Sequence, residues 1–270
     1  MPELAALQER IRELGDVIVA FSGGADSAFL AFVAHDTLGV DHVVAATAVS
    51  PSLATDELAD CRALAGEWGL EFVEVTTHEI DNDEYRANDG DRCYWCKSSL
   101  MDALAPLSAT SGAAIALGVN LDDLGDHRPG QRAAAERGAV FPLVDAGFTK
   151  ADVREWSQRL GLRTWDKPAA ACLASRVPYG TSVNVEVLGR IERAERALRT
   201  LGFRELRVRH YEDTARLEVP LVDLDRVLAN REAVVAAVRG AGYEYVTLDL
   251  EGLRSGNLNA ALAATDPTRH

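Results

Sequence analysis

The sequence predicts an α/β protein, with a doubly wound parallel sheet followed by a smaller C-terminal α+β domain. Over the first 182 residues, short apolar runs alternate with helical segments, a pattern typical of parallel strands covered by helices on both faces. Beyond that point the pattern changes to a long helix, two alternating strands, another helix and a final strand. We therefore expect domains at residues 1–182 and 183–270.

The first domain is expected to hold four parallel strands, of which the first two are buried apolar runs. They are residues 17–21, 43–49, 72–75 and 113–118. Helices are expected before and between them, at residues 1–15, 28–35, 52–68 and 97–109. Residues 80–92 are polar, and we expect them to be irregular.

The second domain is expected to begin with a helix at residues 185–201. Two alternating strands, 206–211 and 215–219, flank a turn at Glu212-Asp213-Thr214. A helix at 222–239 and a strand at 244–250 complete a β-β-α-β pattern.

The composition limits the partners and the location of this protein. The chain has 270 residues and a formal net charge of −14, and this acidic balance argues against a nucleic-acid substrate. A small anionic substrate remains compatible with it. No apolar run reaches the roughly 20 residues of a membrane span, and Met1-Pro2-Glu3-Leu4 is unlike the basic start of a signal peptide. We expect a cytoplasmic protein with no membrane partner.

The most informative segment is Ser22-Gly23-Gly24-Ala25-Asp26-Ser27, directly after the first strand. Backbone N–H groups at such a turn and helix start favour an anion, and glycines let a phosphate approach the backbone. The two serines add hydroxyl donors, and Asp26 would cap the helix or hold Mg²⁺. No Lys follows the glycines, as a Walker A loop requires, and a G-x-G-x-x-G fingerprint is absent too.

Three of the four cysteines form a second signal. Cys93 and Cys96 make a C-x-x-C at the start of a helix, and Cys172 lies far along the chain. Three thiolates suit a 4Fe–4S cluster with one open iron, whereas zinc, a redox pair or unrelated cysteines are the other interpretations. Cys61 lies on an apparent helix face and is expected to be a small buried hydrophobe.

Several segments together carry a family resemblance. SGGADS resembles the PP-loop of ATP pyrophosphatases, and the chain resembles the LarE family over roughly residues 15–250. The segments are SGGADS, Gly118-Val119-Asn120-Leu121-Asp122-Asp123, Arg128-Pro129-Gly130, CYWCK and KPAAACLASRVPYG. The resemblance implies a HUP-like PP-loop fold and an ATP-dependent sulfur transferase in nickel-pincer nucleotide cofactor synthesis. Such an enzyme adenylates a carboxylate of pyridinium-3,5-biscarboxylic acid mononucleotide, and sulfur then displaces AMP to give a thiocarboxylate.

The resemblance leaves two sources of sulfur. In members with three cysteines it implies a 4Fe–4S cluster that carries an extra sulfide, which here would be held by Cys93, Cys96 and Cys172. In other members a cysteine near the ACLASR position gives up its own sulfur, and Cys172 would then be a single-use donor. We favour the cluster, and the cysteine donor is the competing mechanism.

Roles for individual residues follow by position. Besides the three cysteines, Asp26 and Lys97 are the candidate catalytic residues, although Lys97 also fits an ordinary surface lysine. ATP, with Mg²⁺, would be held by Ser22, Gly23, Gly24, Asp26, Ser27, Thr47, Ser50, Gly118 and Asp122.

The nucleotide substrate would meet residues of both domains. The resemblance places its phosphate at Ser175, Arg207 and Arg209, and the two arginines alternate on a strand, so they share one face. A solvated strand face is the alternative there. Trp95 would stack on the pyridinium ring or simply pack.

The family also places a carboxylate metal site at a subunit interface, near Glu195, Glu218 and Asp225, which are otherwise solvated surface acids. It further suggests a hexamer, a sulfur-donating partner and a downstream nickel-insertion protein.

Three rival functions share parts of this pattern. An ammonia-dependent PP-loop synthetase of the NAD synthetase kind has no need of three cysteines. A tRNA thiolation enzyme would require a basic surface. A non-catalytic nucleotide or iron–sulfur sensor would not release pyrophosphate.

Overall fold

The computed structural model describes residues 2–125, 129–168 and 172–254 of the chain. Arg128 and residues 169–171, which belong to two of the resemblance motifs, lie outside the described residues. The chain divides into two compact units, one formed by residues 1–79 and 93–171 and the other by residues 80–92 and 172–270. The expected boundary at residues 182 and 183 remains a prediction.

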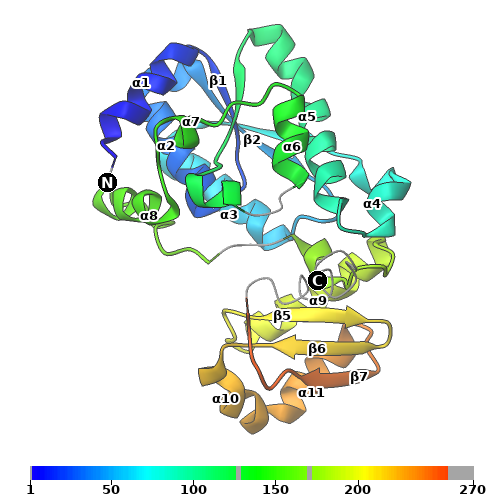
Figure 1. The fold of residues 1–270 in the computed structure, drawn as a ribbon. Helices are drawn as coiled ribbons and strands as arrows, with labels where there is room; N and C mark the ends of the chain where they lie inside the picture. Colours follow the sequence, from blue (N-terminus) through cyan, green and yellow to red (C-terminus); the bar gives the residue numbers. More distant parts are fainter. Residues whose placement is uncertain (1, 126–128, 169–171, 255–270) are drawn as a thin grey trace, which may run out of the picture. The chain divides into compact units, whose positions relative to one another are not determined.

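The first unit contains a parallel sheet of four strands in the order β3-β2-β1-β4. Figure 1 labels the two central strands, β1 and β2. The strands are β1 (Val17–Ala20), β2 (Val43–Val49), β3 (Glu71–Thr76) and β4 (Ala114–Leu117). Strands β1, β2 and β4 fall on apolar runs of the sequence and are largely buried, because a strand covered on both faces needs apolar side chains in both directions. The edge strand β3 has no fully buried residue. The α/β class expected from the sequence is confirmed.

Helices cover both faces of this sheet. One face packs against α1 (Leu4–Leu14), α2 (Ala25–Leu38), α3 (Thr55–Trp68) and α8 (Lys150–Arg159). The other face packs against α5 (Arg92–Ser111) and α6 (Pro129–Glu136). The remaining short elements are η1 (Val40–His42), η2 (Glu79–Asp81), η3 (Leu121–Gly125) and α7 (Pro142–Asp145).

The strand order creates a switch point beside β1. This strand lies between β2 and β4, and the helix that follows it, α2, covers one face. The helix that follows β4, α6, contributes to the opposite face. Because the two connections lead to opposite faces of the sheet, the carboxyl ends of β1 and β4 mark the position at which ligands bind in open α/β sheets.

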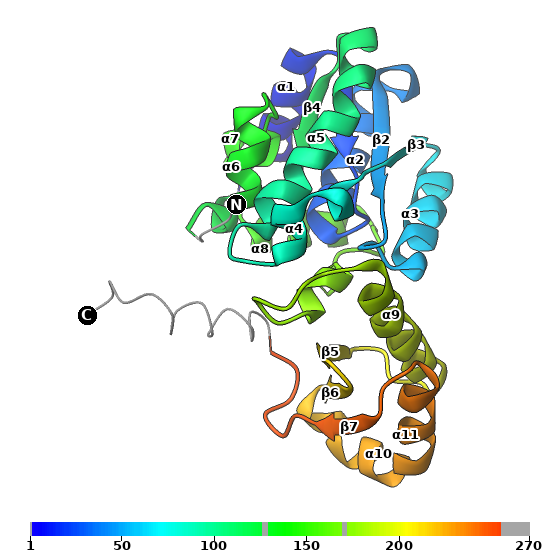
Figure 2. The ribbon, with the colours of Figure 1, turned by 90° about the vertical axis from the view of Figure 1, so that its right-hand side faces the viewer.

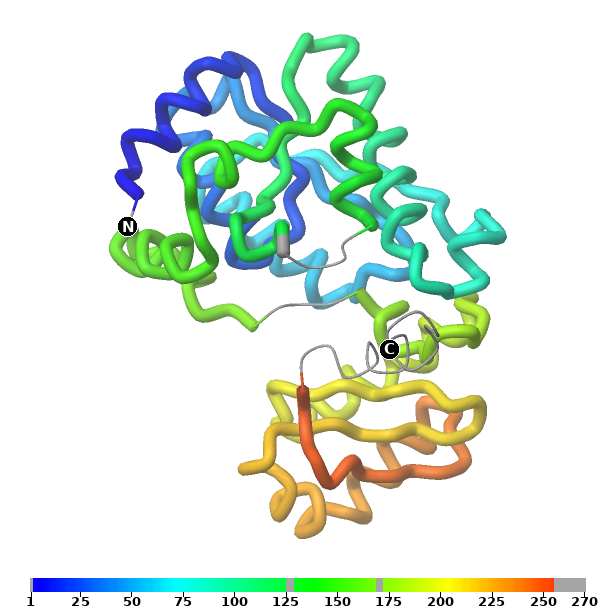
Figure 3. The backbone as a smooth tube through the Cα atoms, viewed as in Figure 1, coloured from blue at the N-terminus to red at the C-terminus, as the bar shows by residue number. Residues whose placement is uncertain are grey.

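The second unit has its own three-stranded sheet, in the order β5-β6-β7. Strands β5 (Arg207–Tyr211) and β6 (Thr214–Glu218) form an antiparallel pair, and β7 (Tyr245–Leu248) pairs parallel to β6. Figures 2 and 3 let the reader follow these strands and the helices that pack on them. The helices are α9 (Val185–Thr200), α10 (Leu224–Ala229) and α11 (Arg231–Gly240), with η4 (Leu173–Arg176) and η5 (Leu221–Asp223) as single turns.

Residues 80–92 are more ordered than the sequence suggested. They contain the short helix α4 (Asp83–Ala87), which begins because the Asn82 side chain accepts hydrogen bonds from the N–H groups of Glu84 and Tyr85. Asn88 ends the helix at φ 54° and donates through Nδ2 to the carbonyls of Pro178 and Thr181, at 2.8 and 3.0 Å. The segment is therefore held by contacts distant in sequence, which its polar composition does not reveal.

Among the described residues, none of the helices has the length and apolar content that crossing a membrane requires.

Candidate active site

The glycine turn after β1 leads directly into α2. Gly23 has φ +66°, a conformation that L side chains rarely adopt, and Gly24 is the residue before the first helical one. The first N–H groups of a helix have no partner within it, so those of α2 point out of its N-terminal end toward any bound anion. The backbone geometry thus matches the anion site expected from the sequence.

The two serines of the turn are brought together. Ser22 Oγ and Ser27 Oγ are 3.0 Å apart, and the Ser22 N–H donates to Ser27 Oγ at 3.2 Å. Ser27 is buried and donates to the Gly24 carbonyl, while Ser22 is exposed. Ser27 therefore shapes the turn, and the Ser22 hydroxyl is the one open to a ligand.

Asp26 does not cap the helix, because Gly24 occupies the cap position and Asp26 lies within the first turn. Its carboxylate accepts a hydrogen bond from Asn120 Nδ2 at 3.0 Å. Burial raises the pKa of the Asp26 carboxyl, while the Asn120 hydrogen bond and Lys150 act in the opposite direction, and Asp123 raises it further. The charged form is thus kept in a site that disfavours it, a frequent property of functional carboxylates.

The segment after β4 lies beside the start of α2. A Cβ on Gly118 would lie 2.7 Å from the Ser27 nitrogen, so only glycine lets β4 approach the start of α2 this closely. Asp122 is exposed and accepts from the Lys150 N–H at 2.8 Å. Asn120 and Asp123 were not among the predicted site residues, although their place directly after a strand that ends beside the turn was the available signal.

Thr47 and Ser50 lie at and just beyond the end of β2. Thr47 is buried and donates through Oγ1 to the Phe21 carbonyl at 2.6 Å, which fixes the start of the glycine turn. Ser50 donates to the buried carboxylate of Glu79. Both hydroxyls are engaged by the protein itself in this structure.

Cys93 and Cys96 lie in the first two turns of α5, with Cys93 exposed and Cys96 half-buried. Neither forms a disulfide. Gly130 of α6 comes close here, since a Cβ on it would lie 2.9 Å from both the Cys93 carbonyl oxygen and Lys97 Cγ. Lys97 is half-buried, and Trp95 meets Tyr94 edge to face with centroids 5.3 Å apart.

In the second unit, Cys172 precedes η4 and is exposed, and it also forms no disulfide. Its carbonyl accepts a hydrogen bond from Arg176 Nη1 at 3.3 Å. Cys61, by contrast, is fully buried in the first unit, and burial raises the pKa of its thiol to about 11, as befits a packing residue.

The residues expected to meet the substrate phosphate gather in the second unit. Arg209 Nη1 donates to the Ser175 carbonyl at 2.7 Å, and Arg209 Nη2 donates to Glu218 at 2.8 Å. The pKa of Arg207 is lowered by burial and then by the charges of Arg209 and Arg176. The nearby carboxylates of Glu218 and Glu195 act in the opposite direction on the pKa of Arg207 but do not outweigh these causes, so positive charge predominates around its guanidinium group.

Two of the three acids expected at a metal site form ion pairs with arginines. Glu195 is buried and pairs with Arg176 at 2.8 Å and Arg199 at 3.0 Å. Glu218 is buried and is held by Arg209 together with Arg216 at 3.2 Å, whereas Asp225 is exposed on α10. Within the described part of a single chain, no group of three or more His, Cys, Asp or Glu residues is placed to hold a metal ion.

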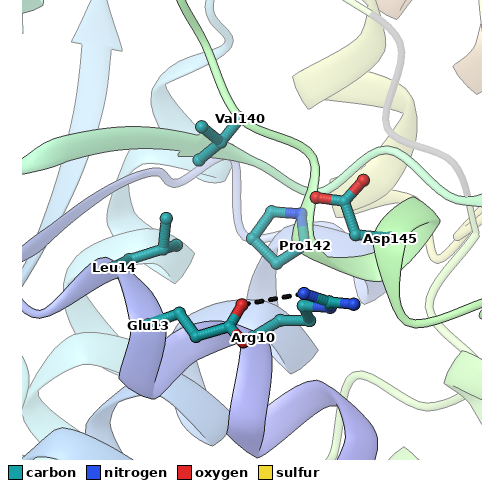
Figure 4. Close-up of a pocket in the computed structure, with 6 residues that line it drawn as sticks. All are labelled: Arg10, Glu13, Leu14, Val140, Pro142 and Asp145. Atoms are coloured by element: carbon teal, nitrogen blue, oxygen red, sulfur yellow. Dashed lines mark hydrogen bonds and ion pairs between the residues drawn. The ribbon is translucent and has the colours of Figure 1, made fainter.

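A shallow pocket of about 340 Å³ lies elsewhere, beside α1 and the segment from Val140 to Asp145 (Figure 4). Arg10 and Glu13 form an ion pair of 2.8 Å on its floor. None of its lining residues belongs to the predicted site.

The first unit therefore defines a doubly wound α/β protein with a glycine turn and a half-buried carboxylate at its switch point. Over 259 residues the chain is 38% identical to the pyridinium-3,5-bisthiocarboxylic acid mononucleotide synthase of Lactiplantibacillus plantarum, covering 96% of this chain and 94% of that protein. The chain belongs to that synthase's family, the LarE family, as its motifs suggested.

Two further relatives have no described function. The chain is 46% identical over 263 residues to an uncharacterized protein of Synechocystis, covering 96% of this chain and 98% of that protein. It is 26% identical over 240 residues to an uncharacterized protein of Methanocaldococcus jannaschii, covering 88% and 91%. No family model matches the chain.

Proposed function

We propose that this protein is an ATP-dependent sulfur transferase that converts a carboxylate of pyridinium-3,5-biscarboxylic acid mononucleotide into a thiocarboxylate. The observation that carries the proposal is the 38% identity, over nearly the whole of both chains, to a synthase named for the bisthiocarboxylic product. The glycine turn at the switch point supports the use of a nucleotide.

Adenylation would precede sulfur insertion, because a carboxylate oxygen is a poor leaving group and AMP is a good one. A substrate carboxylate oxygen attacks the α-phosphorus of ATP, and the bond to the bridging oxygen of pyrophosphate breaks. The backbone N–H groups of residues 23–27 and the Ser22 hydroxyl would receive the negative charge of the departing pyrophosphate. Asp26 would hold Mg²⁺, which when bound neutralises phosphate charge.

Sulfur would come from the three-cysteine set. Cys93, Cys96 and Cys172 form no disulfides, and each is exposed or half-buried, so their thiols fit the ligation of an iron–sulfur cluster. The cluster, when bound, would supply the sulfide that replaces AMP. In the competing mechanism, the Cys172 thiolate attacks the acyl carbon of the adenylate and displaces AMP to form a thioester. Loss of the Cys172 Cα proton to a base would then break the Cβ–Sγ bond, leaving dehydroalanine in the protein and the sulfur on the product as a thiocarboxylate.

Recognition of the substrate would rest on its phosphate. Arg207 and Arg209 alternate on β5, and Ser175 is tied to Arg209 through its carbonyl. Guanidinium groups donate paired hydrogen bonds to phosphate oxygens, and this would orient the pyridinium carboxylate.

Pyrophosphate release tests the proposal. We expect release only when ATP, Mg²⁺ and the dicarboxylate nucleotide are all present, and Asp26→Ala should abolish it while the protein still unfolds cooperatively. Mass spectrometry of the product distinguishes the rivals: a thiocarboxylate supports the proposal, and an amide formed with ammonium supports a synthetase. Release that depends on tRNA, or no release at all, would overturn it.

The same samples separate the two sulfur sources. Loss of one sulfur from the Cys172 peptide after a single turnover would identify the cysteine donor. An unchanged protein mass, with product formed, would support the cluster.

A further inference from the structure

Lys167 reaches the glycine turn from a distant part of the chain. Its Nζ lies 3.7 Å from the position that a Cβ on Gly23 would occupy. The side chain is 17% exposed. It therefore lies against the predicted phosphate site, although its place in the sequence gives no sign of this.

Two acids of α3 hold this ammonium group. Lys167 Nζ donates to Glu57 Oε2 at 2.9 Å and to Asp60 Oδ2 at 2.7 Å. An ammonium group has three N–H donors, so one is left for a ligand once these two bonds are made. No protein acceptor for it is found among the described residues.

The group is charged at neutral pH. Burial alone would lower the pKa of Lys167, but the hydrogen bonds and charges of Asp60 and Glu57 outweigh it and raise the pKa. Removing a cation from water costs free energy, and here the two carboxylates offset that cost. They thus keep a partly buried positive charge beside the turn.

A purely structural role is already filled by a neighbour. Arg163 ties the same segment to α3 through Asp60 at 2.7 Å and Glu67 at 3.0 Å. Lys167 repeats the contact to Asp60, and it is the Lys167 side chain that also reaches Gly23. The glycine turn itself lacks the lysine that follows the glycines in a Walker A loop.

We propose that Lys167 binds the pyrophosphate part of the nucleotide, its ammonium group contacting a β- or γ-phosphate oxygen of ATP bound at residues 22–27. This inference rests on the proposed function, because it requires that the turn binds ATP. Lys167 would act as a fixed positive charge and would not transfer a proton. A segment distant in the sequence, after α8, would thus supply by tertiary contact the lysine that a Walker A loop supplies from within its own sequence.

Calorimetric titration of the full-length protein with Mg-ATP, inorganic pyrophosphate and AMP tests this. We expect Lys167→Met to weaken the binding of ATP and pyrophosphate by about tenfold or more. AMP lacks the β- and γ-phosphates, so its affinity should be unchanged. Arg163→Met is the matched control, since it removes a cation that also pairs with Asp60 of α3, together with Glu67, and it should leave all three affinities unchanged.

Each outcome decides between roles. Unaltered pyrophosphate binding by a folded Lys167→Met would overturn the proposal and leave Lys167 as a tether to α3. Equal losses for AMP and pyrophosphate would also overturn it. If Lys167→Met fails to unfold cooperatively, Lys167→Gln, which keeps a donor for Glu57, is titrated instead, and failure of both variants to fold makes the role structural. Absence of ATP and pyrophosphate binding in the wild-type protein would instead refute the proposed function.

Discussion

Asn120 Nδ2 donates a hydrogen bond of 3.0 Å to Asp26 Oδ1, joining the segment after β4 to the first turn of α2. The bond crosses the switch point between two neighbouring strands, and it directs a half-buried carboxylate of the glycine turn. Asp123 also lies close enough to act on the charge of Asp26. The site thus concentrates negative charge where a magnesium ion would be needed beside phosphate.

The first prediction concerns the pH dependence of Asp26. Because burial raises the pKa of this carboxyl in the folded state, the folded protein holds the proton more tightly, and ionisation at neutral pH lowers the free energy of unfolding. Asp26→Asn keeps the acceptor for Asn120 and removes the charge. We expect its thermal midpoint to exceed that of the wild type at pH 7.

This gain should shrink as the pH falls toward about 4, where the wild-type carboxyl becomes protonated in both states. The exposed Asp41 provides the control, and Asp41→Asn should show no comparable gain at pH 7. Equal thermal midpoints for Asp26→Asn and the wild type at pH 7 would contradict the prediction that the ionised Asp26 carboxylate lowers the free energy of unfolding. ATP-dependent pyrophosphate release should be lost in Asp26→Asn at every pH.

The second prediction concerns Gly118. A Cβ there would lie 2.7 Å from the Ser27 nitrogen and 2.8 Å from the Asp26 carbonyl carbon, both backbone atoms of α2. Gly118→Ala should lower the free energy of unfolding by about 1–3 kcal/mol and weaken ATP binding. Urea unfolding measures the first effect and calorimetry the second.

Gly66 is the matched control, because it lies inside α3 and a Cβ there meets nothing within 4 Å. Gly66→Ala should raise the free energy of unfolding by about 0.5–1 kcal/mol through helix propensity alone. If Gly118→Ala proved as stable as the wild type and bound ATP normally, the close approach of β4 to α2 would be required neither for stability nor for ATP binding.

The third prediction separates Arg207 from Arg209. Arg207→Ala should weaken binding of a pyridinium mononucleotide by about tenfold. It should not lower the free energy of unfolding, because burial and neighbouring guanidinium groups already disfavour the charge of Arg207.

Arg209→Ala should cost stability instead, by about 3 kcal/mol or more, since it removes a partner of the fully buried Glu218. Urea unfolding and titration with nicotinic acid mononucleotide, a probe that carries the pyridinium ring and the phosphate, measure both effects. Unchanged mononucleotide binding by Arg207→Ala would exclude that guanidinium from phosphate recognition.

The fourth prediction concerns the cysteines. After anaerobic reconstitution with iron and sulfide, the wild type should bind a cluster, and the serine variants of Cys93, Cys96 and Cys172 should each lose it. Cys61→Ser should keep the cluster, because burial raises the pKa of that thiol and hides it from metal. Iron and sulfide analysis provides the readout, and a full cluster in Cys172→Ser would contradict the three-thiolate set.

Much of the first unit follows from local patterns in the sequence. The apolar runs at 17–21 and 43–49 predict buried strands, and the glycines at 23 and 24 predict the turn, because strand formation and backbone freedom depend on neighbouring residues. The family motifs are also short stretches of sequence, so they could be recognised without the structure. The comparison with the Lactiplantibacillus plantarum synthase confirms the assignment to the LarE family.

Residues 80–92 show where local reasoning failed. Their polarity suggested an irregular segment, yet Asn82 begins a helix and Asn88 is held by carbonyls about ninety positions away, at Pro178 and Thr181. Asn120 was likewise missed as the partner of Asp26, 94 positions distant. Hydrogen bonds between residues so far apart leave no periodic pattern in the sequence, so only the three-dimensional structure reveals them.

By itself, the sequence determined the α/β class, the strands and the position of the glycine turn, since each arises from short-range preferences. Only the tertiary structure decided which side chains surround that turn. It brought Asn120 to Asp26 and Lys167 to Gly23, and it paired the buried Glu195 and Glu218 with arginines. The physical reason is that burial and charge pairing depend on the packing of segments distant along the chain, which no local pattern of residues encodes.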